Sequence, residues 1–508
     1  MLSDGKRSVP ATLAEIVACR NLSGGPIRLS EELDMLDRLF RLTENRTTVR
    51  TELSAGAVTF LTMAYIIVVQ PAVLSGRMFG FDTGMDFGAV TTATCLAAAL
   101  ATAVMGLWAR YPIAQAPGMG ENFFFVLTTL PAAAGVAAAR GVAAWQVGLG
   151  VVFYSGVLFL LLTLTGFRTR LLDAVSPSLK SAIAAGIGLF VAFIGLQNAG
   201  VIVKHPGSAV ALNPHFNSPD LLVFFFGLIL AAVLHVRRVP GSILWGIAGA
   251  TLLSLGLRYA LPMVPQLVDA TIVRESVLMT RFTPATAIVS APPSVGPVAL
   301  RMDLVGALDP TMLPYIGVFL FMVLFDTVGT LIGVGRQAGF IVDNKLPRAD
   351  RAMLSDAVGT TAGAMLGTST VTSFIESAAG VEQGGRTGLT ALVTAVLFLI
   401  APLFSPLIAM IGSYPPITAP ALVLVGAMMM KCVAEIAWDD PSEAIPAFLT
   451  LLGIPLSYSI ADGLALGLIS YPTIKLLSGR RREVNGMMIV VAVLLVAYFV
   501  LLRSRVGG

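Results

Sequence analysis

A hydrophobic run in the first half of the chain is interrupted by the stretch Pro117-Gly118-Met119-Gly120-Glu121-Asn122. Proline and glycine break a helix, and a carboxylate and an amide are costly to place in hydrocarbon. A second interruption follows in the other half, at Gly367-Thr368-Ser369-Thr370-Val371-Thr372-Ser373-Phe374-Ile375-Glu376-Ser377. Broken backbone at membrane depth is tolerated only where it is buried in protein or lines a cavity. Paired interruptions in two halves of a chain are typical of the binding site of a secondary transporter.

The composition is that of an integral membrane protein rather than a soluble domain. Of the 508 residues, 56% are hydrophobic and 12% are charged. A span needs roughly 20 mostly apolar residues, and the chain offers about 14 such stretches. The sequence therefore predicts an all-α polytopic protein that crosses the lipid bilayer of the cell membrane many times.

Weak similarity between the two halves favours an internal repeat. Phe60-Leu61-Thr62-Met63 matches Phe319-Leu320-Phe321-Met322, and the two broken segments are separated by a similar distance. Because seven spans per half is odd, the second copy would be inverted. The expected divisions are a polar N-terminal segment 1–50, a first seven-span repeat 51–260, a connection 261–311 without a clear helical pattern, a second seven-span repeat 312–478, and a C-terminal segment 479–508. The apolar run 486–503 is either an extra span or an in-plane helix.

The positions of the loop charges indicate the orientation. Lys and Arg concentrate on the cytoplasmic side of membrane proteins. A cytoplasmic N-terminus places most loop cations on that side: Arg110, Arg168, Arg170, Lys180, Arg237, Arg238, Arg336, Lys345, Arg348, Arg351, Arg386, Lys431 and Arg480 to Arg482. The first 50 residues contain no apolar segment of a signal peptide.

The sequence offers little material for metal or cofactor chemistry. The three cysteines are scattered, and the three histidines lie in or beside loops. Neither set has the spacing of metal ligands. We therefore expect no metal, no cofactor and no nucleic-acid partner. The oligomeric state stays open, a homodimer included.

Asp326 is the first candidate site residue. It lies deep in the apolar run that begins near residue 312, where a lone carboxylate is expensive and is a functional candidate by default. The small residues Gly329 and Gly333 follow it and would let a ligand approach closely. The alternative is a residue that hydrogen-bonds a neighbouring helix.

Glu376 is the second candidate, and it lies in the second broken segment beside Thr372 and Ser373. The hydroxyl groups supply donors and acceptors to a ligand. A buried carboxyl group can bind and release a proton near neutral pH, so Glu376 and Asp326 are the candidates for proton coupling. The alternative for Glu376 is a cap of the following half-helix.

Asn122 and Glu121 are the candidates in the first broken segment. The Asn122 amide offers both a donor and an acceptor, which suits the edge of a heterocycle. Glu121 joins the site if it faces the cavity and is structural if it faces a loop or a partner helix. The adjacent Phe123, Phe124 and Phe125 could stack on a planar ligand, but packing against lipid is the commoner role. Asp356 and Asp462 fall close to expected span ends, where solvation by the interface favours a structural role.

Several of these motifs resemble those of the AzgA-type purine permeases, within the nucleobase–cation symporter-2 (nucleobase/ascorbate) group. The resemblance rests on Thr59-Phe60-Leu61-Thr62-Met63-Ala64-Tyr65-Ile66, Ala116-Pro117-Gly118-Met119-Gly120 with Asn122, Leu324-Phe325-Asp326-Thr327-Val328-Gly329-Thr330, the second broken segment through Gly380, and Glu443-Ala444-Ile445-Pro446-Ala447-Phe448. It runs from about residue 35 to 480. The sequence departs from the family pattern at Glu121 and Phe123. The commoner family pattern has an apolar residue before the asparagine and a small residue after it.

The resemblance implies two inverted seven-span repeats, with spans 3 and 10 each broken by a short strand. Spans 1–4 and 8–11 would form a core domain and spans 5–7 and 12–14 a gate domain, with substrate between them. It also implies proton-driven uptake of adenine, guanine or hypoxanthine, with Asn122, Asp326 and Glu376 as binding residues. The alternatives are a carrier of another small metabolite or an anion on the same fold, and an intramembrane enzyme. The enzyme is disfavoured because it would need a nucleophile paired with a base, or metal ligands.

Overall fold

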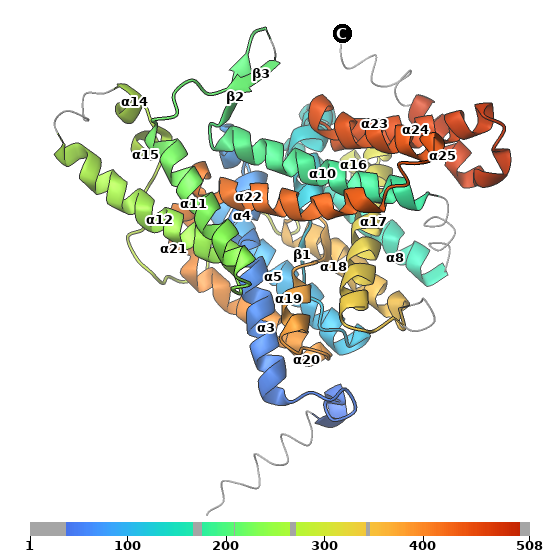
Figure 1. Ribbon diagram of the computed structural model, residues 1–508, viewed down its shortest axis with the longest axis horizontal. Helices are drawn as coiled ribbons and strands as arrows, with labels where there is room; N and C mark the ends of the chain where they lie inside the picture. Colours follow the sequence, from blue (N-terminus) through green and yellow to red (C-terminus); the bar gives the residue numbers. More distant parts are fainter. Residues whose placement is uncertain (1–36, 166–174, 208, 265–270, 342–345, 498–508) are drawn as a thin grey trace, which may run out of the picture.

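The computed structural model describes residues 37–165, 175–207, 209–264, 271–341 and 346–497, and helices dominate it (Figure 1). The first half contains α3 (Val49–Met63), α4 (Ile66–Leu74), α5 (Phe87–Val104), β1 (Gln115–Pro117), α6 (Met119–Phe124), α7 (Leu130–Arg140), α8 (Ala144–Thr165), α10 (Pro177–Asn198), α11 (Pro219–Val236) and α12 (Ser242–Ala260). A hairpin of β2 (Ile202–His205) and β3 (Ala209–Leu212) joins α10 to α11.

The second half contains α17 (Leu313–Gln337), α18 (Ala349–Leu366), β4 (Val371–Ser373), α19 (Ser377–Glu382), α20 (Gly388–Ile400), α21 (Ser405–Gly412), α22 (Pro415–Met429), α23 (Pro441–Ser457), α24 (Ile460–Leu477) and α25 (Gly486–Ala497). The connection 261–311, which has no clear helical pattern in the sequence, contains the short helices α14 (Thr271–Arg274), α15 (Val277–Thr280) and α16 (Leu304–Ala307). Each is a single turn, too short to produce a helical period in the sequence.

Several helices begin where the sequence supplies a capping side chain. The Asp86 carboxylate accepts a hydrogen bond from the Ala89 amide at 2.7 Å and starts α5. Ser176 and Ser218 cap α10 and α11, and each is followed by a proline at the first helical position. A proline is well placed there because it lacks the N–H that a helix start cannot satisfy.

Ten helical stretches in the described ranges are long and apolar enough to cross a membrane. They are Val49–Leu74, Phe87–Ala109, Met119–Arg140, Ala144–Thr165, Pro177–Asn198, Pro219–Val236, Ser242–Met263, Leu313–Gly335, Gly388–Gly412 and Pro415–Glu435. The other four expected spans correspond to α18, to β4 with α19, to α23 and to α24, which are charged, interrupted or rich in proline.

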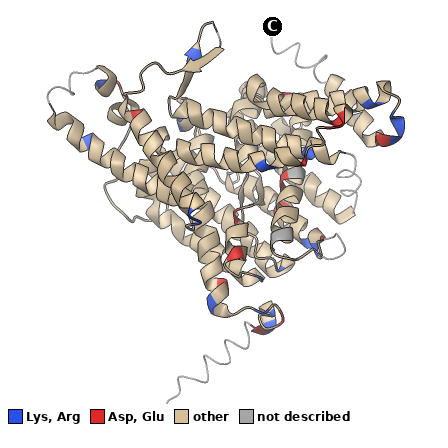
Figure 2. Ribbon diagram, viewed as in Figure 1, with Lys and Arg blue, Asp and Glu red and all other residues tan. Residues whose placement is uncertain are grey.

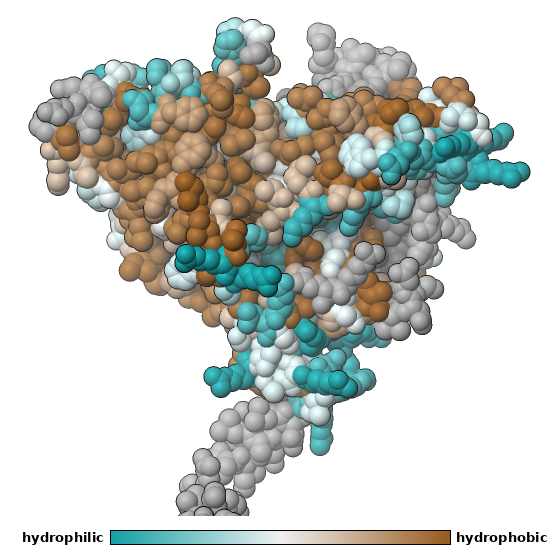
Figure 3. Space-filling model, viewed as in Figure 1, coloured by the Kyte–Doolittle hydropathy of each residue, from teal (hydrophilic) through white to brown (hydrophobic). Residues whose placement is uncertain are grey.

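The outer surface is that of a protein surrounded by lipid. On α11, the large apolar side chains of Leu222, Phe226, Ile229 and Val233 are exposed at helical spacing, and Figure 3 shows a broad hydrophobic surface over this side of the molecule. Charged residues are sparse among the helices and gather at their ends, as around the start of α3 and between α24 and α25 (Figure 2). The chain is a multi-pass membrane protein.

The helices pack in two groups. The first group contains α3, α4, α5, α8, α17, α18, α19 and α20, and the second contains α10, α11, α12, α22, α23 and α24. Helix α6 lies at the boundary, because it contacts α4 and α17 of the first group and α10 and α24 of the second. Gly120 permits this approach, since a Cβ there would lie 2.8 Å from Ile187 Cγ2 on α10.

Candidate functional site

The two broken segments meet as a pair of short antiparallel strands. In the register of β1 and β4, Gln115 lies opposite Ser373, and Pro117 lies opposite Val371. The pairing continues at both ends: the Gly118 amide donates to the Thr370 carbonyl at 3.1 Å, and the Phe374 amide donates to the Ala114 carbonyl at 3.0 Å. Figure 1 shows β1 in the middle of the molecule, among helices of both halves. Each strand leads directly into a short helix, β1 into α6 and β4 into α19.

Asn122 is fully buried on α6, beside the chain that leads into β4. Its side-chain oxygen accepts a hydrogen bond from the Ser369 hydroxyl. Its Nδ2 has no hydrogen-bond partner within the described residues. A buried donor without a partner is uncommon and costly, so this amide is a candidate contact for a ligand.

Gln70 on α4 faces the same segment and was not among the candidate residues predicted from the sequence. Its Nε2 donates to the Thr368 hydroxyl at 3.0 Å and to the Ser369 hydroxyl at 3.3 Å. Its Oε1 has no partner among the described residues, and the Thr370 hydroxyl also has none. The available signal was an amide inside the otherwise apolar run Ile66–Leu74.

Asp326 projects from α17 toward β4. Its carboxylate accepts a hydrogen bond from the Thr372 hydroxyl at 3.0 Å. Glu121 also lies near Thr372. Its carboxylate packs against Gly118, where an added Cβ would be 3.2 Å from the Thr372 hydroxyl. Glu121 is 2% exposed. The fold therefore brings Glu121, Asp326 and Thr372 together around the β4 strand.

Glu376 lies just before α19 and contacts α4. Its carboxylate accepts a hydrogen bond from the Tyr65 hydroxyl at 2.7 Å. Tyr65 occupies the break between α3 and α4. It belongs to one of the family motifs but was not predicted to be a site residue. Gly380 permits close packing of α19 on α3, because a Cβ there would overlap the Thr59 hydroxyl. This packing holds Glu376 beside Tyr65.

The expectation for Asp356 was wrong. It was placed near a span end and solvated, but its side chain is 0% exposed. Helix α18 begins at Ala349, earlier than the apolar pattern indicated, so Asp356 lies two turns inside it. Its carboxylate accepts hydrogen bonds from Gln115 Nε2, from the Thr327 hydroxyl at 2.5 Å, and from the Ser373 amide and hydroxyl at 3.0 and 2.9 Å. Asp356 therefore ties β1 and β4 to α17 and α18, and it engages the hydroxyl of Ser373.

We expect Asp356→Ala to destabilise the protein strongly. The substitution leaves buried donors of Gln115, Thr327 and Ser373 without their acceptor, and each such group costs about 1–3 kcal/mol. The melting temperature of the purified protein in detergent measures the effect. Ser155→Ala is the matched control, because the buried Ser155 hydroxyl has no partner in the described part of the chain. Equal melting temperatures for the two variants would show that Asp356 does not hold β1 and β4 against α17 and α18.

The three consecutive phenylalanines are buried in protein, so their expected packing against lipid was wrong. Phe123 makes edge-to-face contacts with Phe79 and with Phe190 of α10, at ring distances of 5.9 and 6.1 Å. Phe124 packs against Phe319 of α17 at 4.8 Å. Helix α6 is enclosed between both groups of helices, which accounts for their burial. Phe123 thus forms part of the boundary beside Asn122.

The described residues contain no group of three or more His, Cys, Asp or Glu side chains that could hold a metal ion. The arrangement instead offers carboxylates, an amide with an unpaired donor, hydroxyls and aromatic rings around a strand pair. Such a set can bind a small polar molecule by hydrogen bonds.

This protein has many apolar helices and two helix breaks that pair with each other. These features together place it in the class of membrane permeases. A model of the permease family (Xan_ur_permease) matches residues 50–466, and the chain belongs to this family of nucleobase/ascorbate transporters. The chain is 42% identical to the guanine/hypoxanthine permease PbuG of Bacillus subtilis, over 91% of this chain and 99% of that protein. It is 39% identical to the adenine permease AdeP of Escherichia coli, over 93% of this chain and 97% of that protein.

Solved structures support the same architecture. The transmembrane domain of the cyanobacterial bicarbonate transporter BicA superimposes with a TM-score of 0.55 at 13% sequence identity, covering 82% of this chain and 97% of that domain. At this identity the similarity concerns the fold alone. The chain therefore shares the fold of that transmembrane domain.

Proposed function

We propose that this protein is a secondary active transporter that takes up purine nucleobases together with protons. The observation that carries the proposal is the strand pair β1–β4, around which Asn122, Asp326 and Glu376 come together from distant parts of the chain. Asn122 and Glu376 are buried there, and Asp326 is half-buried. The relatives named above, permeases for guanine and hypoxanthine and for adenine, support the substrate class.

We infer a fold of about 14 spans in two inverted repeats. The antiparallel direction of β1 and β4 supports this, because equivalent strands in inverted copies run in opposite directions. The first group of helices would be the core domain and the second the gate domain. Transport would then follow from movement of one group against the other around a site at α6.

In this proposal the purine lies beside the two strands. The unpaired Asn122 Nδ2 would donate to a ring nitrogen or a carbonyl of the base, and the Asp326 carboxylate would accept from a ring N–H. Glu121, Thr372 and Glu376 complete the polar lining, and Phe123 provides an aromatic wall. Ser373 contributes to the site indirectly: its hydroxyl donates a hydrogen bond to Asp356, which fixes the position of β4.

Glu376 and Asp326 are the proposed proton carriers. Each carboxylate has a hydroxyl donor that could reorient, Tyr65 for Glu376 and Thr372 for Asp326. A carboxylate that is solvated in one state and enclosed in the other changes its proton occupancy between states. The proposed orientation places the N-terminus in the cytoplasm, as the distribution of loop cations favours.

Competition for uptake tests the substrate class. Cells or proteoliposomes that contain the protein should take up radiolabelled hypoxanthine, and unlabelled adenine, guanine or hypoxanthine should compete far better than uracil, ascorbate or bicarbonate. The physical reason is that a buried polar site rejects ligands that leave its groups unpaired. If uracil or an inorganic anion competed best and purines were inert, the purine proposal would fail while the transporter class would stand.

A further inference from the structure

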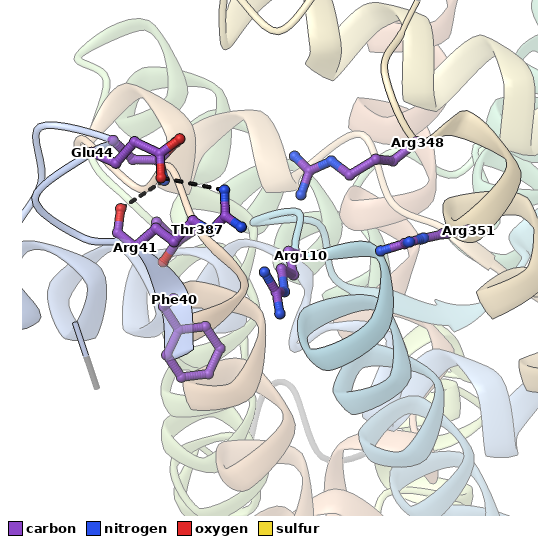
Figure 4. Close-up of a pocket in the computed structure, with 8 residues that line it drawn as sticks. Phe40, Arg41, Glu44, Arg110, Arg348, Arg351 and Thr387 are labelled. Carbon is purple, nitrogen blue, oxygen red and sulfur yellow. Dashed lines mark hydrogen bonds and ion pairs between the residues drawn. The ribbon is translucent and has the colours of Figure 1, made fainter. Parts of the chain in front are cut away.

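A cavity of ≈ 280 Å³ lies where the N-terminal segment meets the first group of helices. Its lining includes Arg41, Glu44, Arg110, Arg348, Arg351 and Thr387. These residues come from the segment before α3, from the end of the α5 span, from the start of α18 and from the start of α20. Figure 4 shows the guanidinium groups of Arg348 and Arg351 extending toward Arg110 and Arg41.

The residues that line this cavity carry an excess of positive charge. One carboxylate, that of Glu44, faces four guanidinium groups in the lining. Glu44 contacts Arg41 at 3.4 Å, and both side chains are largely exposed. Within the described ranges, Arg110, Arg348 and Arg351 form no ion pair with an acidic side chain. Like charges gathered in one cavity repel each other, and a bound anion would offset that repulsion.

Two of the arginines are held in place by aromatic rings. The Arg348 guanidinium lies 4.5 Å from the centre of the Tyr111 ring, and the Arg351 guanidinium lies 6.0 Å from that of Trp108. A stacked guanidinium keeps its planar edge of N–H donors free for a second partner. The lining is thus pre-organised for bidentate recognition of an oxyanion.

The cavity borders the apolar surface of the protein. Trp108 and the preceding Leu107 are more than half exposed, at 56% and 52%. Tryptophan is enriched at the level of lipid headgroups. A ligand with a charged group in the cavity could therefore also contact the lipid-facing surface.

We propose that this cavity binds a phosphate group, carried either by an anionic lipid headgroup or by a small phosphorylated solute. The bound phosphate joins three parts of the chain: the N-terminal segment through Arg41, the end of the α5 span through Arg110, and the start of α18 through Arg348 and Arg351. Helix α18 also carries Asp356, which holds both strands of the candidate site. This proposal is independent of the substrate and of proton coupling.

The test compares the purified full-length protein with Arg110→Gln/Arg348→Gln. The matched control is Arg237→Gln/Arg238→Gln, which removes two exposed arginines between α11 and α12. One arm titrates inorganic pyrophosphate in detergent at constant ionic strength, by calorimetry. The other arm uses nanodiscs of phosphatidylcholine with or without phosphatidylglycerol, and native mass spectrometry counts the phosphatidylglycerol retained.

We expect the pocket variant to weaken binding by about tenfold or more, since it removes two charged hydrogen-bonding groups, and the control to change little. If the protein retains phosphatidylglycerol but does not bind pyrophosphate, the phosphate in the cavity comes from a lipid headgroup. If it binds pyrophosphate, the phosphate comes from a soluble molecule. Binding of neither probe, or equal loss in the pocket and control variants, overturns the proposal. If the double variant does not fold, Arg348→Lys keeps the charge but loses the planar fork. Unchanged binding in that variant also overturns the proposal.

Discussion

Glu376→Gln is expected to abolish accumulation of substrate against its concentration gradient. Glutamine keeps the size of the side chain and can still accept a hydrogen bond from Tyr65, but it cannot gain or lose a proton. A gradient of one pH unit stores about 1.4 kcal/mol per proton, which supports about tenfold accumulation when one proton accompanies each substrate. Uptake of radiolabelled hypoxanthine into proteoliposomes with an alkaline interior measures this, and the variant should equilibrate at a ratio of about one.

The matched control for this experiment is Glu382→Gln, at an exposed position on the same helix α19. It should accumulate substrate as the unmodified protein does. Exchange of internal for external substrate needs no net proton movement, so it serves as the check that Glu376→Gln is folded and inserted. If Glu376→Gln exchanged substrate and also concentrated it on the imposed gradient, Glu376 would not be the proton carrier.

Asp326→Asn is expected to lower the affinity for purine by about one to two decades. A hydrogen bond from a ring N–H to a buried carboxylate contributes about 1.5–3 kcal/mol, and each 1.4 kcal/mol is a factor of ten in affinity. Asparagine preserves the size of the side chain but replaces one acceptor oxygen with an NH₂ donor. This donor cannot form a hydrogen bond with a ring N–H of the ligand. Equilibrium binding of radiolabelled hypoxanthine to the purified protein measures the change.

Two further variants separate a direct contact from a structural effect. Asp82→Asn, in the exposed loop before α5, is the matched control and should bind normally. Thr372→Val removes the hydroxyl that donates to Asp326 while keeping a similar shape, so it should weaken binding less than Asp326→Asn. Normal affinity in a correctly folded Asp326→Asn would assign Asp326 to helix packing rather than to the substrate.

The membrane class and the two positions of broken helix could be predicted from the sequence because they depend on local properties. Hydrophobic runs of sufficient length identify helices in lipid, and the glycines and proline of 117–120 interrupt them wherever they are placed. The family motifs likewise pointed to Asn122, Asp326 and Glu376, since polar groups inside apolar runs stand out individually.

The roles of Gln70, Tyr65 and Asp356 were not predicted, and the reason is physical. Gln70 and Tyr65 gain their partners from the second broken segment, about 300 residues away in sequence. Asp356 was assigned to the interface because the apolar pattern of α18 starts late, whereas the helix itself starts at Ala349. Burial of a single carboxylate depends on which helices cover it, and hydropathy along the chain does not contain that information.

The sequence by itself determined that this chain resides in the membrane, where its helices break, and that Asn122, Asp326 and Glu376 are polar groups inside apolar runs. The tertiary structure alone decided that the two breaks pair as antiparallel strands, that Asp356 ties them to α17 and α18, and that four arginines from three segments share one cavity. The first set follows from the cost of moving each residue into hydrocarbon, which is local. The second set follows from hydrogen bonds and packing between segments distant in the chain, which form only when the helices assemble.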